Sequence, residues 1–258
     1  MTDGYGLRGQ PNDLHGQPFD TLAHTAEQDI IQVMIEGMAR HPRSHQKMIG
    51  PSEIGIPCSR RLIRKLAQHQ EPERQPAWKP AVGTACHAQQ EEWFGHADYQ
   101  SRYLIEERVD VGTIGGQPVT GSADLFDPYL GIVTDWKFVG KTRMNLYRAK
   151  GPGQQYRVQA HLYGRGFERA GYKVRGVMIM FIPRDGELAD SYPWVEEYRP
   201  DVAEWGLTRA NHLYQQLVAL GVDQALELYP ACGDTYCPWC QQERSKATVE
   251  RLKAHPFA

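Results

Sequence analysis

The sequence predicts an α/β fold in which a mixed central β-sheet is flanked by helices. Segments rich in β-branched and aromatic residues alternate with segments in which apolar residues recur at helical spacing, and no internal repeat interrupts this order. A helix expected at residues 154–170 separates two predicted strands, as a crossover between parallel strands does. These two observations favour the mixed sheet.

The individual elements are expected from local signals. Thr25 and Gln28 form a capping-box pattern, so a helix is expected to open at Thr25 and to place its apolar stripe in the core. Further helices are expected at residues 58–68, 84–94, 154–170 and 202–220. Strands are expected at residues 103–111, 117–120, 175–182 and 194–198, and on both sides of a turn at residues 127–131. Residues 1–23 lack apolar periodicity, so we expect a flexible arm followed by a single domain, residues 24–258.

Composition sets the class of protein. The 258 residues are 41% hydrophobic and 23% charged, which is ordinary for a soluble chain with one sizeable core. A net charge of -2 argues against a protein that coats nucleic acid through bulk charge. No apolar run approaches the ~20 residues that span a bilayer, and no leader pattern opens the chain, so a cytoplasmic location without a membrane partner is expected. In that reducing compartment the five cysteines are expected to be ligands or free thiols.

Contact with phosphate would have to come from local basic sets, although a solvated surface is the commoner role of such sets. The candidate sets are Arg60, Arg61, Arg64 and Lys65; Lys141, Arg143, Arg148 and Lys150; and Arg165, Arg169, Lys173 and Arg175.

Two acidic residues and a lysine flank the predicted turn at residues 127–131. If the hairpin is symmetric about the middle of that turn, Asp124 lies opposite Asp135 on one sheet face, with carboxylates within ~5 Å. Lys137 projects from the same face, since it follows Asp135 by two residues. Paired carboxylates suit a hard cation such as Mg²⁺ or Mn²⁺, and a lysine beside them can orient or activate the attacking water and stabilise charge on a phosphate. The pattern therefore predicts metal-dependent hydrolysis.

Two other patterns predict no separate chemistry. Residues 140–142 read Gly-Lys-Thr, like the end of a phosphate-binding loop, but the glycine that such a loop needs earlier is missing. We expect instead a loop after the strand of Asp135, from which Lys141 and Arg143 reach the phosphates of the substrate. Cys86 adjoins His87 on a helix, where its side chain points about 100° away, so a small core residue is favoured over a Cys-His dyad.

Four short motifs occur in order along the chain. They are Gly83-Thr84-x-x-His87, Gly121-x-x-Asp124, Asp135-x-Lys137 and Gln159-x-x-x-Tyr163. This order resembles the RecB-like branch of the PD-(D/E)XK nuclease superfamily, over roughly residues 50–245. The resemblance implies that His87 and the two aspartates bind the metal with the main-chain carbonyl of Trp136, and that Lys137 is catalytic. It also implies that Gln159 and Tyr163 contact DNA near the scissile phosphate.

Four cysteines have the arrangement of a metal site. Cys232, Cys237 and Cys240 lie in one short segment, and Cys58 lies far upstream. This one-plus-three arrangement resembles the iron-sulfur nucleases of the same branch, the AddB-type nuclease domains and the CRISPR-associated RecB-like exonucleases. The resemblance implies a 4Fe-4S cluster that joins the C-terminal tail to the N-terminal helices. Here the longer interval precedes the shorter one, which departs from those families, so a structural Zn²⁺ held by four thiolates is the alternative.

The expected function is a metal-dependent DNA exonuclease that hydrolyses phosphodiester bonds, acting on single-stranded ends. Recombination, replication or CRISPR adaptation in a phage or bacterium is the expected setting, with proteins of those pathways as partners. The alternative is a cluster-bearing DNA-binding or adaptor subunit without nuclease activity of its own. The presence of Asp124, Asp135 and Lys137 together argues against a decayed site.

Overall fold

The computed structural model describes residues 19–40, 48–72, 78–96 and 102–254. The chain separates into two compact units, residues 1–45 with 75–78, and residues 46–74 with 79–258. The expected division into an arm, residues 1–23, and one domain, residues 24–258, stays a prediction, because residues 1–18 lie outside the described part of the chain.

Helix α1 (Phe19–Ala39) begins before Thr25, so the predicted helix start is wrong. Thr25 lies inside the helix, where its hydroxyl donates to the carbonyl of Thr21 at 2.9 Å, a bond that satisfies the side chain without a cap. The apolar stripe expected in the core is also exposed, since Ile30 and Ile31 are 62% and 48% exposed.

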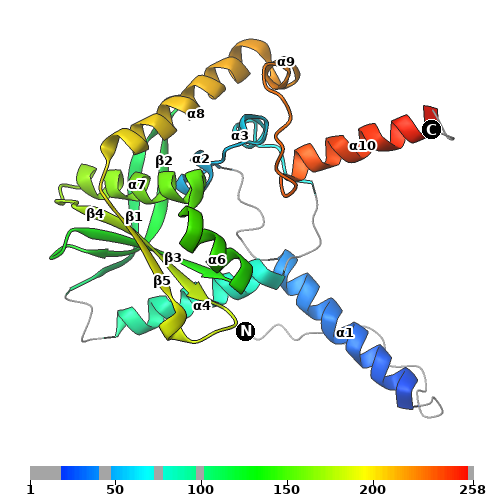
Figure 1. Ribbon diagram of the computed structural model, residues 1–258, viewed down its shortest axis with the longest axis horizontal. Coiled ribbons are helices and arrows are strands. Elements are labelled where there is room, and N and C mark those ends of the chain that lie inside the picture. The colour runs from blue at the N-terminus through cyan, green and yellow to red at the C-terminus, as the bar shows by residue number, and fades with distance from the viewer. Residues whose placement is uncertain (1–18, 41–47, 73–77, 97–101, 255–258) are drawn as a thin grey trace, which may run out of the picture. The chain divides into compact units, whose positions relative to one another are not determined.

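The larger unit is built on a five-stranded sheet of order β1-β2-β3-β4-β5 (Figure 1). The strands are β1 (Leu104–Ile114), β2 (Gln117–Asp127), β3 (Ile132–Val139), β4 (Gly176–Pro183) and β5 (Tyr192–Glu197). Only the pair β3 and β4 is parallel. A parallel pair needs a crossover, which here consists of α6 (Lys141–Lys150) and α7 (Gly153–Arg169). The prediction of a mixed sheet flanked by helices is therefore confirmed.

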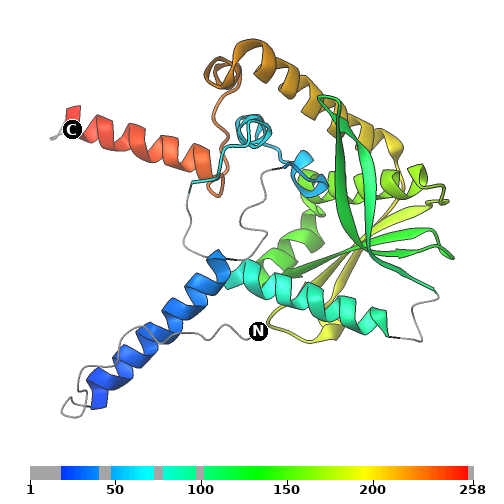
Figure 2. The ribbon, with the colours of Figure 1, turned by 180° about the vertical axis from the view of Figure 1, so that it is seen from behind.

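Helices α7 and α8 (Pro200–Leu220) cover one sheet face and enclose the main core. Phe126 of β2 stacks on Phe167 of α7, with ring centroids 4.2 Å apart. Gly166 allows α7 to lie close to β1, because a Cβ at that position would lie 2.5 Å from Val109. The long β1–β2 hairpin runs beside α8 (Figure 2), where the N–H of Gly115 donates to Asn211 at 2.9 Å.

Helix α4 (Trp78–Gly95) contributes to a second apolar cluster on the sheet. Phe94 stacks on Trp136 at 5.6 Å, beside Leu125 and Ile182. Because neighbouring residues of a strand face opposite sides, Trp136 packs in this cluster while Asp135 and Lys137 face the α7 side.

Four further helices in the described part of the chain belong to the larger unit. They are α2 (Pro51–Ile54), α3 (Ser59–Leu66), α9 (Val222–Glu227) and α10 (Pro238–Ala254), with a 3₁₀ turn at Leu188–Asp190. Cys58, the residue at which a helix was expected to begin, is the N-cap of α3. Residues 141–150 were expected to begin as a loop and instead form α6. Within the described ranges, no helix has the length and apolar character needed to cross a membrane.

A charged network attaches α7 to the edge strand β5. Arg157 donates to both carboxylate oxygens of Glu196, at 2.7 and 2.5 Å. The main-chain N–H of Arg199 donates to Nδ1 of buried His161, so the proton of the neutral ring is on Nε2, which donates to Glu196 at 3.0 Å. The bonds from Arg157 lower the pKa of Glu196 to about 2, and burial lowers the pKa of His161.

We expect Glu196→Gln to lower the free energy of unfolding at pH 7 by about 1–3 kcal/mol, because it removes charge-assisted hydrogen bonds. The pKa of Glu196 falls on folding from 4.5 to about 2, so its contribution is present above pH 4.5 and is lost as the pH falls toward 2. Urea unfolding measures this: the difference in free energy of unfolding between wild type and Glu196→Gln should become smaller as the pH is lowered from 7 to 3. Glu197→Gln, at the exposed neighbouring position, is the control; an equal effect there would contradict the assignment.

Candidate metal and nucleic-acid site

The hairpin of β2 and β3 has the predicted register. Its last ladder pair joins Leu125 to Thr134, so the following positions bring Asp124 opposite Asp135. In place of another ladder bond, the main-chain N–H of Trp136 donates to Oδ2 of Asp124 at 2.7 Å. This bond fixes the Asp124 carboxylate between the two strands.

Asp135 is a buried carboxylate, 2% exposed, with a partner on each oxygen. The Gln159 amide donates to Oδ1 at 2.8 Å, and the Lys137 ammonium contacts Oδ2. Burial raises the pKa of Asp135 to about 6, although Lys137 opposes that rise. Burial of Lys137 favours the neutral amine, but Asp135 and Asp124 outweigh it and raise the lysine pKa. Because its pKa is raised, Lys137 is favoured as an ammonium, which can stabilise negative charge.

Glu106 of β1 is a functional candidate that the sequence analysis missed. It lies between the ladder pairs of Ile105 and Glu107, at the position opposite Asp124. Its φ of 49° is unusual for a residue other than glycine and costs about 1–2 kcal/mol. Such conformations gather at functional sites, where the surrounding structure holds them in place.

His87 reaches the same group from α4. Its Nδ1 lies 3.5 Å from Oδ1 of Asp124, and its ring packs edge-on against Phe138. Burial disfavours the imidazolium, but the hydrogen bond with Asp124 outweighs it and raises the pKa of His87.

The donor set fits a hard divalent cation. Ligand atoms of His87, Glu106 and Asp124 all lie within 4.8 Å of one another. Two carboxylates and an imidazole suit Mn²⁺, and the carboxylates suit Mg²⁺. Asp135 is outside this group and is engaged by Gln159 and Lys137, so its expected role as a metal ligand stays a prediction.

The residues expected to contact DNA have different surroundings. Gln159 and Tyr163 are 5% and 6% exposed on α7, and the Gln159 amide orients Asp135. Lys141 and Arg143 are exposed in the first turn of α6, which follows β3 directly. Contact with DNA stays a prediction for all four.

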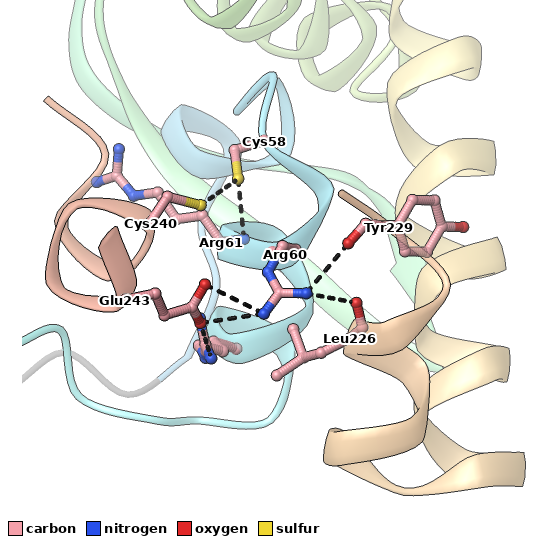
Figure 3. Close-up of polar contacts among 8 residues, drawn as sticks. Cys58, Arg60, Arg61, Leu226, Tyr229, Cys240 and Glu243 are labelled. Carbon is pink, nitrogen blue, oxygen red and sulfur yellow. Dashed lines mark hydrogen bonds and ion pairs between the residues drawn. The ribbon is translucent and has the colours of Figure 1, made fainter. Parts of the chain in front are cut away.

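The four cysteines expected to share a site are brought together. The sulfurs of Cys58, Cys232, Cys237 and Cys240 lie within 4.8 Å of one another, and those of Cys58 and Cys240 are 3.8 Å apart (Figure 3). Burial raises the pKa of the Cys58 thiol and raises that of Cys237 to about 11, so a nearby cation would favour the thiolate form of these two residues. The cluster joins the C-terminal region to α3, as predicted, and Cys86 is outside it.

Ion pairs hold the same two segments together. Arg60 of α3 donates to both oxygens of Glu243 on α10 at 3.1 Å and to the carbonyls of Leu226 and Tyr229 (Figure 3). Arg64 also donates to Glu243, at 2.5 Å. The basic residues of α3 that were candidates for phosphate contact are therefore engaged within the chain.

Comparisons with known proteins give weak similarities. No protein-family model matches the chain, and neither does any curated protein. The protein in the crystal structure of SSO0001 is 15% identical in sequence to this chain, and the two structures have a TM-score of 0.48 over 83% of this chain and 93% of that one. The alkaline exonuclease LHK-Exo from Laribacter hongkongensis is 11% identical with a TM-score of 0.47, over 72% of this chain and 97% of that one. A phage-related exonuclease from Haemophilus somnus 129PT is 13% identical with a TM-score of 0.42, over 62% and 81%. Values this low assign no activity to the chain.

We expect Glu106→Gln to weaken Mn²⁺ binding by at least about tenfold, because it removes a carboxylate from the donor group. Isothermal titration calorimetry with MnCl₂ measures this change. Glu107→Gln removes the same charge at the exposed next position and should leave the affinity unchanged. Equal effects of the two changes would mean that Glu106 acts only through net charge.

Proposed function

We propose that this chain is a metal-dependent deoxyribonuclease that hydrolyses phosphodiester bonds. The observation that carries the proposal is the buried pair of Asp135 and Lys137 next to the donor group of His87, Glu106 and Asp124. Burying a charged pair is costly and contributes little net stability, so a function at the site explains why it is kept.

Each residue has a role in such a reaction. His87, Glu106 and Asp124 would hold Mg²⁺ or Mn²⁺, which when bound lowers the pKa of water and neutralises phosphate charge. The Lys137 ammonium stabilises the charge that develops on the phosphate. Gln159 and Lys137 together fix the orientation of Asp135, so the acidic group is preorganised.

We further propose an exonuclease that acts on single-stranded ends, in recombination, replication or CRISPR adaptation. The order of the four motifs supports this choice. An adaptor subunit without independent activity is the alternative, and the nuclease assay below distinguishes the two.

Asp124→Asn is expected to reduce cleavage by about 10²-fold or more, because it removes a charged ligand. The change suits the structure, since the amide oxygen still accepts from Trp136 N–H and the amide nitrogen faces His87. Asp135→Ala is a poorer test, because it leaves Gln159 and Lys137 buried without their acceptor.

The measurement is a time course on single-stranded DNA labelled at either end, with Mg²⁺, with Mn²⁺ and without added cation. Loss of label from one end shows an exonuclease and its polarity. Asp185→Asn, an exposed acid outside the site, should cleave like wild type. Binding of DNA without cleavage by the folded wild-type protein would favour the adaptor.

We propose that the four cysteines hold a 4Fe-4S cluster, as their one-plus-three arrangement implies. The 3.8 Å between Cys58 and Cys240 sulfurs also fits a single tetrahedral Zn²⁺, whose ~2.3 Å bonds set its ligands about 3.8 Å apart. All four sulfurs lie within 4.8 Å of one another, which is close to the spacing around one Zn²⁺, whereas the thiolates on the four irons of a 4Fe-4S cube lie farther apart, so binding of the cluster would require the four cysteines to move apart. In either case the centre would act as a staple between α3 and the C-terminal segment.

Purified protein is expected to be brown and to contain about four irons, with the colour lost in Cys237→Ser. Metal analysis and visible absorption spectra measure both properties. Cys86→Ser, outside the group, should keep the colour. A colourless wild-type protein with one zinc would replace the iron-sulfur assignment.

A further inference from the structure

Tyr236 is a large aromatic side chain that the cysteine-bearing loop holds in solvent. The side chain is 66% exposed and lies in the segment between Cys232 and Cys237. Its main-chain N–H donates to Asp234 at 2.8 Å, and Arg244 donates to the carbonyls of Cys232 and Asp234. These hydrogen bonds fix the loop, so Tyr236 has a defined position in which two thirds of its side chain is exposed.

Tyr236 makes a cation–aromatic contact with Arg143 of α6, whose guanidinium carbon lies 5.2 Å from the ring centroid. This helix has four basic residues and no acidic residue, and Lys141 and Arg143 are exposed in its first turn. An aromatic ring can stack on a base, and neighbouring guanidinium and ammonium groups can bind phosphates, so this surface suits a nucleic-acid strand.

A series of contacts joins this surface to the candidate catalytic lysine. The Lys137 ammonium lies 5.1 Å from the ring centroid of Tyr156, which lies 5.9 Å from that of Tyr147. Tyr147 is four residues from Arg143 on α6, so the two share a helix face, and its ring stacks on Phe181 at 4.4 Å. Tyr147 and Tyr156 are half-buried, so side chains with some exposure lie between Lys137 and the exposed Tyr236.

We propose that Tyr236 and Arg143 form a stacking platform for a base of single-stranded DNA, at the outer end of a track that leads to Lys137. This inference rests on the proposed nuclease function and adds the residues that select the strand. A base of a single strand exposes its face and can stack on Tyr236, whereas duplex bases cover one another. Lys141 and Arg143 lie where they bind the phosphates of the same strand.

The test is binding of a fluorescently labelled oligonucleotide by the full chain in the Asp124→Asn background, so that the strand is bound and not cut. Tyr236→Ala is expected to weaken binding of single-stranded DNA by about 5- to 100-fold, the range for loss of one base–aromatic stack. Tyr236→Phe keeps the ring and should stay within about twofold of its parent. Tyr129→Ala, which removes a tyrosine that is 82% exposed on the β2–β3 turn, should bind like its parent.

An oligonucleotide with a run of abasic sites distinguishes stacking from other causes. Tyr236→Ala should bind the abasic strand as its parent does, because no base is there to stack. A strand with 2-aminopurine should be quenched by the parent and by Tyr236→Phe, and not by Tyr236→Ala. Equal metal content in all variants excludes damage to the cysteine centre.

Several outcomes would overturn the platform. They are unchanged binding by Tyr236→Ala, equal weakening of normal and abasic strands, equal weakening of duplex binding, and no binding of single strands by the parent. If the wild-type protein cleaves DNA but Tyr236→Ala binds single strands normally, the nuclease function stands and the platform does not. Ring-dependent binding by a wild-type protein that does not cleave would leave the platform standing without the nuclease.

Discussion

The buried carboxylate of Asp135 sets the main constraint on this structure. An ionised group with almost no exposure needs partners on both oxygens, and these come from two different elements, Lys137 on β3 and Gln159 on α7. Helix α7 must therefore lie close to the sheet and in one position along it. Gly166 allows that approach against Val109, and the Glu196 network ties the same helix to β5. The position of α7 on the sheet therefore determines both the packing of the core and the orientation of Asp135.

The cysteine group solves a separate problem, which is to attach a segment far along the chain. Cys58 and Cys240 are 182 positions apart, and closing so long a loop costs entropy that a few surface contacts barely offset. Arg60, Arg64 and Glu243 add charge-assisted bonds between the same helices. These bonds orient α10 on α3, and a cation on the thiolates would make the attachment durable.

The sequence predicted features that follow from short-range rules. Symmetry of the β2–β3 turn places Asp124 opposite Asp135, and the register agrees. Glu106 was missed because β1 has an irregularity between Asp110 and Gly112, which shifts the pairing with β2 by one residue. A regular hairpin would put Glu107 opposite Asp124 instead. Helix α6 was missed because Gly140 gives it no side-chain cap and its first turn has no acidic residue, so the usual start signals are lacking.

The first turn of α6 has basic residues where acidic ones would stabilise a helix. Basic residues at a helix N-terminus oppose the helix dipole, so Lys141 and Arg143 do not stabilise the helix that carries them. Their position is explained by what surrounds them, since α6 begins four residues after Lys137 and its Arg143 contacts Tyr236 of the cysteine loop. The loop that closes the chain on α3 therefore also presents an aromatic ring next to the helix that leaves the acidic site. A metal centre at the four cysteines would hold this loop on α3, so the attachment of the tail and the position of Tyr236 beside α6 depend on one short segment.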